Sequence, residues 1–288
     1  MFNQNIKSPV KIPVSKIHPF EGNPYKVLDN EEMNFLIESI QQQGIISPVV
    51  VRPIENTKDE YEVISGHRRL RASVKAGLET VPAFIYAINR DEAAIMLVDS
   101  NLHREHILPS EKAFAYKLKL EAIKRQGERT DLTSDQVGRK LESAELIANK
   151  SDDSKTQVRR YIRLTYLIPE LLDLVDEKRI AFTPAVELSY LNEVEQADLV
   201  EEISICDATP NLSQAQRLRA ISRDEGLTPE EIGEILAEEK ANQREKIKIP
   251  AERIRKYFPK SYTIEQIEEA IVKICESRYR ARQGRDSR

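Results

Sequence analysis

The spacing of hydrophobic residues changes along the chain from the alternation typical of strands to the periodicity of helices. In the N-terminal part, β-branched runs predict strands over 10–17, 45–53, 61–65 and 80–88. Between the first two strands, a helix over 31–43 is predicted by the helical spacing of Met33, Leu36, Ile37 and Ile40. We therefore expect a small α+β domain over residues 1–108.

Residues that favour the ends of helices support these bounds. Asp29 or Asn30 can cap the first helix, and Gly44 is suited to the left-handed position that follows its last turn. Gly66 interrupts a strand and opens a second helix, which ends at Gly77.

Beyond Pro109 the strand pattern stops and a series of short helices follows. Their starts are marked by capping boxes, in which a Ser, Thr or Asn precedes a Glu or Gln by three residues. These boxes are Thr133–Gln136, Ser154–Gln157, Asn192–Glu195, Thr228–Glu231 and Thr263–Gln266. Three prolines stand where a first helical residue is expected, namely Pro169, Pro184 and Pro229. We expect an all-α domain over 109–205, then a mainly helical region over 206–288 in which charged residues 239–250 form a linker.

Two successive helices are predicted within the all-α domain after Thr133. The first is predicted over 134–147, with Val137, Leu141 and Ile147 turned inward. The second begins at the Ser154 cap, and its buried face carries Val158, Tyr161 and Ile162. The insertion over 142–153, which overlaps the end of the first helix, is longer than the usual turn of about three or four residues.

Charge is distributed unevenly along the chain, and this distribution favours nucleic acid as a partner. The net charge is −4, but the residues from Lys240 to Arg288 contain 14 Lys and Arg against 7 Asp and Glu. Residues 154–163 also carry four basic side chains and no acid. Local rather than net charge decides such binding, because salt screens charges more than about 10 Å apart.

Other features of the composition indicate a cytoplasmic protein. No run approaches the roughly 18 apolar residues of a membrane span, so we expect no membrane partner. The start of the chain has no apolar run typical of a signal peptide. Cys206 and Cys275 lack the spacing of a metal or redox site, which favours free thiols in a reducing compartment.

The segment EVISGHRRLRAS is the first candidate binding site. A helix that begins just after Gly66 offers unpaired N–H groups to an anion. Arg68, Arg69 and Arg71 add forked donors suited to phosphate oxygens. An equally open interpretation is a basic helix start that pairs with surface acids.

The segment DSNLHREHILPSEKA is the second candidate. If its first half is helical, Asn101, Arg104 and Glu105 share a face that can hold a triphosphate and its metal. A solvated helix end is the simpler alternative. His103 and His106 have the spacing of a metal pair, but without a third ligand we do not expect zinc.

The helix that begins at Ser154 is the third candidate. Burial of Val158 and Ile162 leaves a polar and basic face outward, made of Lys155, Thr156, Gln157, Arg159, Arg160 and Arg163. Such residues can anchor phosphates and contact base edges, and the N-terminal part of a recognition helix contacts the bases. An ordinary basic surface helix is the alternative.

Taken together and in this order, several segments resemble the ParB family of partition proteins. They are GIISPVVVRP (44–53), GHRRLRAS (66–73), SNLHREHILPSEKA (100–113) and the helices over 167–191. The resemblance covers about residues 10–205. It implies a ParB/sulfiredoxin-type N-terminal domain that binds CTP and Mg²⁺, a helix-turn-helix domain, and a C-terminal dimerisation module. It also implies a double-stranded DNA site of centromere type and a ParA-type ATPase as partners, with a location on the nucleoid.

Carried over by position, the resemblance assigns the nucleotide contacts. The triphosphate would contact Gly66, Arg68, Arg69, Arg71, Asn101 and Arg104, with His67 and Glu105 beside them and Asn101 as the one candidate metal ligand. The base and ribose would lie near Asn23, Gly44, Ile45 and Pro48.

Three positions depart from the family pattern. His67 and Ser100 stand where the family commonly has acids, and Ser47 stands where it commonly has glutamine. Loss of carboxylates disfavours Mg²⁺ and hydrolysis, so we expect CTP turnover to be slow or absent. A helix-turn-helix transcription regulator with a degenerate nucleotide site, or a phosphotransferase of the same fold, remain as alternatives.

The last predicted helix carries an apolar stripe. Its members recur at helical spacing and are Ile264, Ile267, Ile271 and Ile274. Such a stripe can form the core of a C-terminal module or the interface of a homodimer, and the sequence leaves both open.

Overall fold

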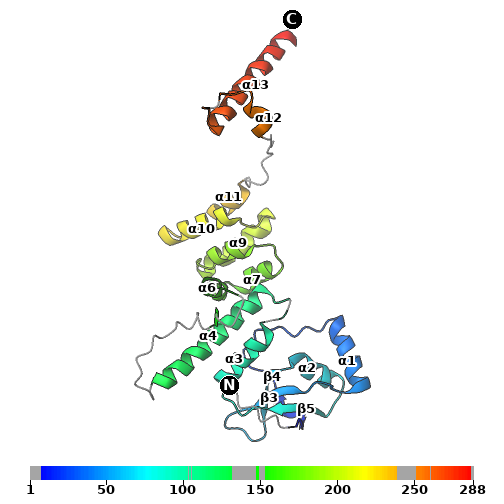
Figure 1. Cartoon of the computed structure of the whole chain (residues 1–288). Helices are drawn as coiled ribbons and strands as arrows, with labels where there is room; N and C mark the ends of the chain where they lie inside the picture. Colours follow the sequence, from blue (N-terminus) through cyan, green and yellow to red (C-terminus); the bar gives the residue numbers. More distant parts are fainter. Residues whose placement is uncertain are drawn as a thin grey trace. The chain divides into compact units, whose positions relative to one another are not determined.

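The computed structural model describes residues 8–102, 104, 106–131, 147–148, 153–238, 251–259 and 261–286 (Figure 1). The chain divides into two compact units, Met1–Glu238 and Glu239–Arg288. Several sequence predictions lie outside the described residues: His103, Glu105, the box Thr133–Gln136, most of the helix over 134–147, most of 142–153 and the linker over 239–250.

A sheet of five strands forms the centre of the described N-terminal part, in the order β1-β5-β3-β4-β2. The strands are β1 (Val10–Pro13), β2 (Ile17–His18), β3 (Val49–Pro53), β4 (Tyr61–Ser65) and β5 (Thr80–Ile85). Pairs β1–β5 and β3–β4 are antiparallel, whereas β2–β4 and β3–β5 are parallel. The strand predicted over 61–65 is confirmed with the same bounds, those over 45–53 and 80–88 are confirmed but shorter, and the one over 10–17 is divided into β1 and β2.

Prolines explain two of the shortened bounds. The predicted strand over 10–17 is split by a 3-10 turn, Val14–Lys16, directly after Pro13. Strand β3 begins only after Pro48. A proline has no N–H to donate, so it is unsuited to the interior of a hydrogen-bonded ladder.

Helices α1 (Glu31–Gln43) and α2 (His67–Lys75) follow the predicted bounds closely. Asn30 rather than Asp29 caps α1, since its side chain accepts a hydrogen bond from the N–H of Met33. Gly44 has φ 72° at the end of α1, as predicted. The two helices pack together through a small core that includes Met33, Ile40 and Ala72.

Helix α3 (Arg90–Asn101) was not predicted, although Asn89 and Glu92 form a reciprocal capping box at its start. It packs on β4 and on the long helix α4 (Pro109–Asp131). A partly buried ion pair joins α3 to α4: Lys119, 1% exposed, bonds to Asp99, which is 37% exposed. The two helices are thereby fixed to each other.

A series of short helices follows α4. They are α6 (Lys155–Leu164), α7 (Pro169–Asp176), α8 (Phe182–Leu188), α9 (Glu193–Cys206), α10 (Leu212–Asp224) and α11 (Pro229–Ala237). One hydrophobic core extends from Leu164 through Leu199 to Leu236. The described part of this segment is thus all α, as expected, while the division of the chain at residues 108 and 205 stays a prediction.

The caps of these helices largely match the sequence signals. Reciprocal boxes form at Asn192 and Thr228, and prolines occupy the first position of α7 and α11. The prediction for Pro184 was wrong, because α8 begins at Phe182 and the proline is its third residue. The position is still tolerated, since N–H groups of a first turn have no partner within the helix.

The second unit contains α12 (Ala251–Arg255) and α13 (Ile264–Asp286), with the predicted cap at Thr263. The apolar stripe lies mostly outside any core. Ile267 is 9% exposed, but Ile264 is 74% and Ile274 is 55% exposed. Nowhere in the described residues is a helix both long and apolar enough to cross a bilayer.

The buried side chain of Gln196 holds together the turns that follow α6 and α8. Its Oε1 accepts from the N–H of Ile168 at 2.8 Å. Its Nε2 donates to the carbonyls of Tyr166, at 3.1 Å, and Leu191, at 2.9 Å. A single amide therefore satisfies three backbone groups.

We expect Gln196→Leu to lower the free energy of unfolding by about 2–4 kcal/mol, because buried backbone groups lose their partners without gaining water. Urea denaturation of both proteins measures this change. The control Gln41→Leu alters an exposed glutamine of α1 and should change stability by less than about 0.5 kcal/mol. A Gln196 variant as stable as the parent would contradict the role assigned to this amide.

Candidate functional sites

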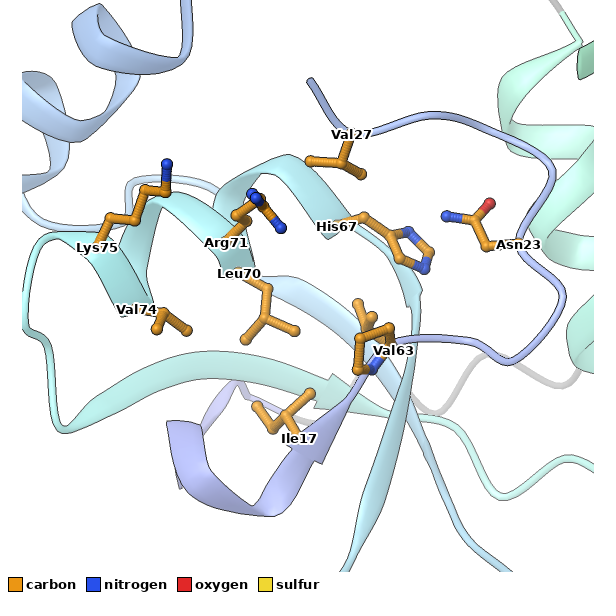
Figure 2. A pocket seen from close by; sticks show the side chains of 10 residues that line it. Ile17, Asn23, Val27, Val63, His67, Leu70, Arg71, Val74 and Lys75 are labelled. Atoms are coloured by element: carbon orange, nitrogen blue, oxygen red, sulfur yellow. The ribbon is translucent and has the colours of Figure 1, made fainter. Parts of the chain in front are cut away.

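A cavity of about 610 Å³ lies beside α2 and the loop that precedes α1. Its lining consists of Ile17, Pro19, Asn23, Val27, Val63, His67, Leu70, Arg71, Val74 and Lys75. Figure 2 shows Arg71 and Lys75 near each other on α2, with the ring of His67 pointing toward Asn23. The cavity is thus lined by apolar side chains such as Val63 and Leu70, with the basic side chains of Arg71 and Lys75 at one end.

The turn at Gly66 determines how α2 starts. Gly66 has φ 99°, and a Cβ there would lie 3.0 Å from both Val49 Cγ1 and Arg69 Nη2. The absence of a side chain lets Arg69 lie against the turn and donate to the carbonyls of Ser47 and, at 2.7 Å, Pro48. Burial lowers the pKa of Arg69.

The predicted base contacts in residues 44–48 do not line this cavity. Gly44 ends α1, Ile45 packs against the cores around α2, and the carbonyl of Pro48 accepts from Arg69. Among the predicted base and ribose residues, the structure brings Asn23 to the cavity. In this structure Arg69 braces the loop before β3.

The other basic side chains of α2 form ion pairs with α1 and the loop before it. Arg68 bonds to Glu32 at 3.0 Å. Arg71 donates to both carboxylate oxygens of Asp29, at 2.7 and 2.5 Å, and Lys75 lies 2.8 Å from the same carboxylate. Hydrogen bonds from Arg71 and then Lys75 hold the pKa of Asp29 well below its usual range.

Two buried polar atoms near the cavity, Nε2 of His67 and Oη of Tyr25, have no hydrogen-bond partner among the described residues. The guanidinium of Arg104 lies over the ring of Tyr25, 5.5 Å from its centre. Burial, and then the charge of Arg104, lower the pKa of His67 to about 4. Burial also disfavours the charged form of Tyr25 and therefore raises the pKa of its hydroxyl. Unpaired buried groups are uncommon in native proteins, so this arrangement suits a ligand that supplies partners.

The prediction of a shared helical face for Asn101 and Arg104 was wrong. Helix α3 ends at Asn101, and Arg104 lies beyond it. The side chains of Ser100 and Asn101 both donate to the carbonyl of Leu97, at 2.9 and 2.7 Å. Such local hydrogen bonds compete with the helical ladder and favour its end.

The fit to Mg²⁺ is poor in the described residues. No group of three or more His, Cys, Asp or Glu side chains suited to a metal occurs there. Asn101 is buried and its amide nitrogen is bonded, and the nearby carboxylate of Asp99 holds Lys119. Mg²⁺ prefers anionic oxygens, which this part of the chain does not supply as a cluster.

Helix α6 begins as predicted. The Ser154 side chain accepts from the N–H of Gln157, and Val158 is buried. Thr156 and Arg159 are exposed, and Lys155 and Gln157 are partly exposed. This N-terminal half presents a polar and basic surface.

Two arginines of α6 do not point outward as expected, because α8 and its flanking residues offer better partners. Arg160 donates to Thr183 at 3.0 Å and lies over Phe182. Arg163 donates to the carbonyl of Ser189 at 2.6 Å and lies 4.0 Å from the ring centre of Tyr190. A guanidinium gains both from such carbonyls and from aromatic faces.

Sequence reasoning missed Lys75, which lines the cavity, and also Asp29 and Tyr25, which lie in the loop beside it. Lys75 follows Arg71 by one helical turn, a spacing that could have identified it. Asp29 was considered only as a cap for α1. Tyr25 lies in a loop with no sequence signal for its burial.

The loop that lines the cavity is also bonded to the helices that follow the sheet. The N–H of Lys26 donates to Glu111 of α4 at 2.8 Å. The Lys26 ammonium lies 3.7 Å from both Asp173 and Asp176 of α7. Asp176 in turn accepts two hydrogen bonds from Ser110.

Comparison with known proteins identifies the class of the sheet-containing part. A family model described as the ParB N-terminal domain matches residues 3–102. The chromosome-partitioning protein Spo0J of Thermus thermophilus is 30% identical over 210 residues, 73% of this chain and 70% of that protein. A nucleoid occlusion protein of Listeria innocua is 31% identical over 202 residues, 69% of this chain and 64% of that protein.

The chain belongs to the ParB family. The alignments span about two thirds of the length of these two relatives, 70% and 64%. Among solved structures, the C-terminally truncated ParB of Caulobacter crescentus complexed to the centromeric parS site is 20% identical. It matches with a TM-score of 0.43 over 73% of this chain and 98% of that one.

The low pKa of His67 predicts a loss of stability in acid. The unfolded chain takes up a proton near the ordinary pKa of about 6.5, while the folded chain resists it down to about 4. Because the unfolded chain binds this proton more readily, the free energy of unfolding falls by roughly 2–3 kcal/mol as the pH falls from about 6.5 to 4.

Urea denaturation at pH 7, 5.5 and 4.5 measures this loss. His67→Gln should lose less stability than the parent over this range, and His106→Gln, which alters an exposed histidine, should lose as much as the parent. Parallel curves for the parent and the His67 variant would contradict the prediction.

Proposed function

We propose that this chain is a DNA-binding partition protein whose N-terminal domain binds CTP. The observation that carries the proposal is the cavity beside α2, which combines the basic side chains of Arg71 and Lys75 with the unpaired Nε2 of His67 in a chain of the ParB family. DNA binding through α6 and nucleotide binding at this cavity are its two parts.

The cavity has the size and chemistry that a nucleotide needs. Its volume falls within the range of about 300–1,000 Å³ typical of small-molecule sites. Arg71 and Lys75 supply positive charge for phosphates, and apolar residues such as Val63 and Leu70 supply a surface for the rest of the ligand. The family resemblance of the arginine segment favours CTP over other nucleotides.

The DNA-binding part rests on α6. In its N-terminal half Thr156 and Arg159 are exposed and Lys155 and Gln157 are partly exposed, while Arg160 and Arg163 bond to α8 and the residues around it. We propose that the first group contacts double-stranded DNA and that the second sets the angle of α6. Gln157 is suited to a base edge and Arg159 to a phosphate.

The remaining partners follow from the family. A homodimer joined through the exposed stripe of α13 would match a palindromic DNA site, because both have two-fold symmetry. A ParA-type ATPase would act on the DNA-bound assembly. The alternative, a DNA-binding regulator without nucleotide, is favoured by the ion pairs that already engage Arg68 and Arg71.

Arg71→Ala should weaken CTP binding at least tenfold, since the forked hydrogen bonds of the guanidinium to phosphate oxygens are lost. Isothermal titration calorimetry with DNA and Mg²⁺ present measures the affinity. The control Arg223→Ala removes an exposed arginine of α10 and should leave it unchanged. Absence of CTP binding by the parent protein would favour the regulator without nucleotide.

Selection from random duplex DNA should enrich a motif, and alanine variants should then separate the roles of the α6 residues. Gln157→Ala should cost about 1–3 kcal/mol and relax specificity at one position. Arg159→Ala should weaken binding to all DNA sequences alike and reduce the dependence of the affinity on salt concentration. Arg217→Ala, in α10, serves as the control. If no motif is enriched, or if both α6 variants bind DNA as the parent does, the proposed DNA interface on α6 is contradicted.

A further inference from the structure

The carboxylate of Asp29 occupies the position between the two basic side chains that line the cavity. It receives two hydrogen bonds from Arg71 and lies 2.8 Å from the ammonium of Lys75. Both cations are 39–48% exposed, so they remain accessible from solvent. The basic end of the cavity is therefore already paired with an anion that belongs to the chain.

This contact does not serve to cap α1. Asn30 is the cap, and its side chain accepts from the N–H of Met33. The bonds of Asp29 instead reach 42 residues along the chain to Arg71. These bonds also connect α2 to the loop before α1, whose Asn23 and Val27 line the same cavity.

A carboxylate and a phosphate compete for the same donors. Both accept the paired N–H groups of a guanidinium in a fork geometry, and both attract an ammonium. Neither cation can bond fully to a second anion while Asp29 holds it. A triphosphate carries more negative charge and more acceptor oxygens than one carboxylate, so it can displace Asp29.

We propose that Asp29 is a built-in competitor of the nucleotide: the phosphates must displace its carboxylate from Arg71 and Lys75, and the contact thereby sets the affinity of the site. This inference rests on the proposed nucleotide-binding function. The contact keeps the two cations ordered before the ligand arrives and disfavours weakly charged ligands. It assigns Asp29 a regulatory role within the site.

The test compares the intact parent protein with Asp29→Asn, which keeps the size of the side chain and removes its charge. Glu31→Gln is the matched control, because it removes the same charge from the start of α1 without touching Arg71 or Lys75. Circular dichroism verifies that all three are folded. Titration calorimetry uses CTP and, separately, inorganic tripolyphosphate, which has no base or ribose for the loop to cover.

Asp29→Asn should bind both CTP and tripolyphosphate roughly three- to tenfold more tightly than the parent, the range expected for loss of partly exposed ion pairs. Glu31→Gln should bind as the parent does. Equal gains in the two variants would mean a general charge effect and overturn the inference. A gain for CTP alone would mean loop opening without competition and would overturn it too.

The remaining outcomes separate the inference from the function on which it rests. If the parent binds CTP and Asp29→Asn binds it no better, the inference fails and the nucleotide site stands. If no variant binds CTP even with DNA and Mg²⁺ present, the proposed nucleotide site fails, and the inference fails with it.

Discussion

The close contact between Gly66 and Arg69 is the constraint on which the N-terminal domain depends. Because Gly66 has no side chain, the chain turns sharply from β4 into α2, and Arg69 lies against the turn. Arg69 then ties α2 to the segment before β3 through the carbonyls of Ser47 and Pro48. With the start of α2 fixed in this way, helical geometry alone places Arg71 and Lys75 one turn apart beside the cavity.

Local signals in the sequence were sufficient for much of this arrangement. Asn30, Gly44 and Gly66 act on neighbouring backbone groups, so their roles could be inferred without a fold. The same reasoning could have found α3 from Asn89 and Glu92, which form the signal used elsewhere in the chain. Strand bounds were less predictable, and two of them were shortened at Pro13 and Pro48.

The partners of charged side chains could not be predicted, since they depend on tertiary structure. The bond between Arg71 and Asp29 joins residues 42 positions apart, and nothing in either segment indicates the other. Arg163 was assigned to solvent on helical spacing, yet Ser189 and Tyr190 hold it. The resemblance indicated which side chains would contact a nucleotide, but only the structure shows which residues of the chain each of them contacts.

The bonds of Lys26 have a thermodynamic consequence. This residue lies in the loop beside the cavity and is bonded to α4 and α7, and α7 closely follows α6. A ligand that draws the loop away from α7 must break these bonds, and a partner that shifts α7 must break them as well. The two binding events are then linked: the ligand changes the affinity for the partner by the same factor by which the partner changes the affinity for the ligand.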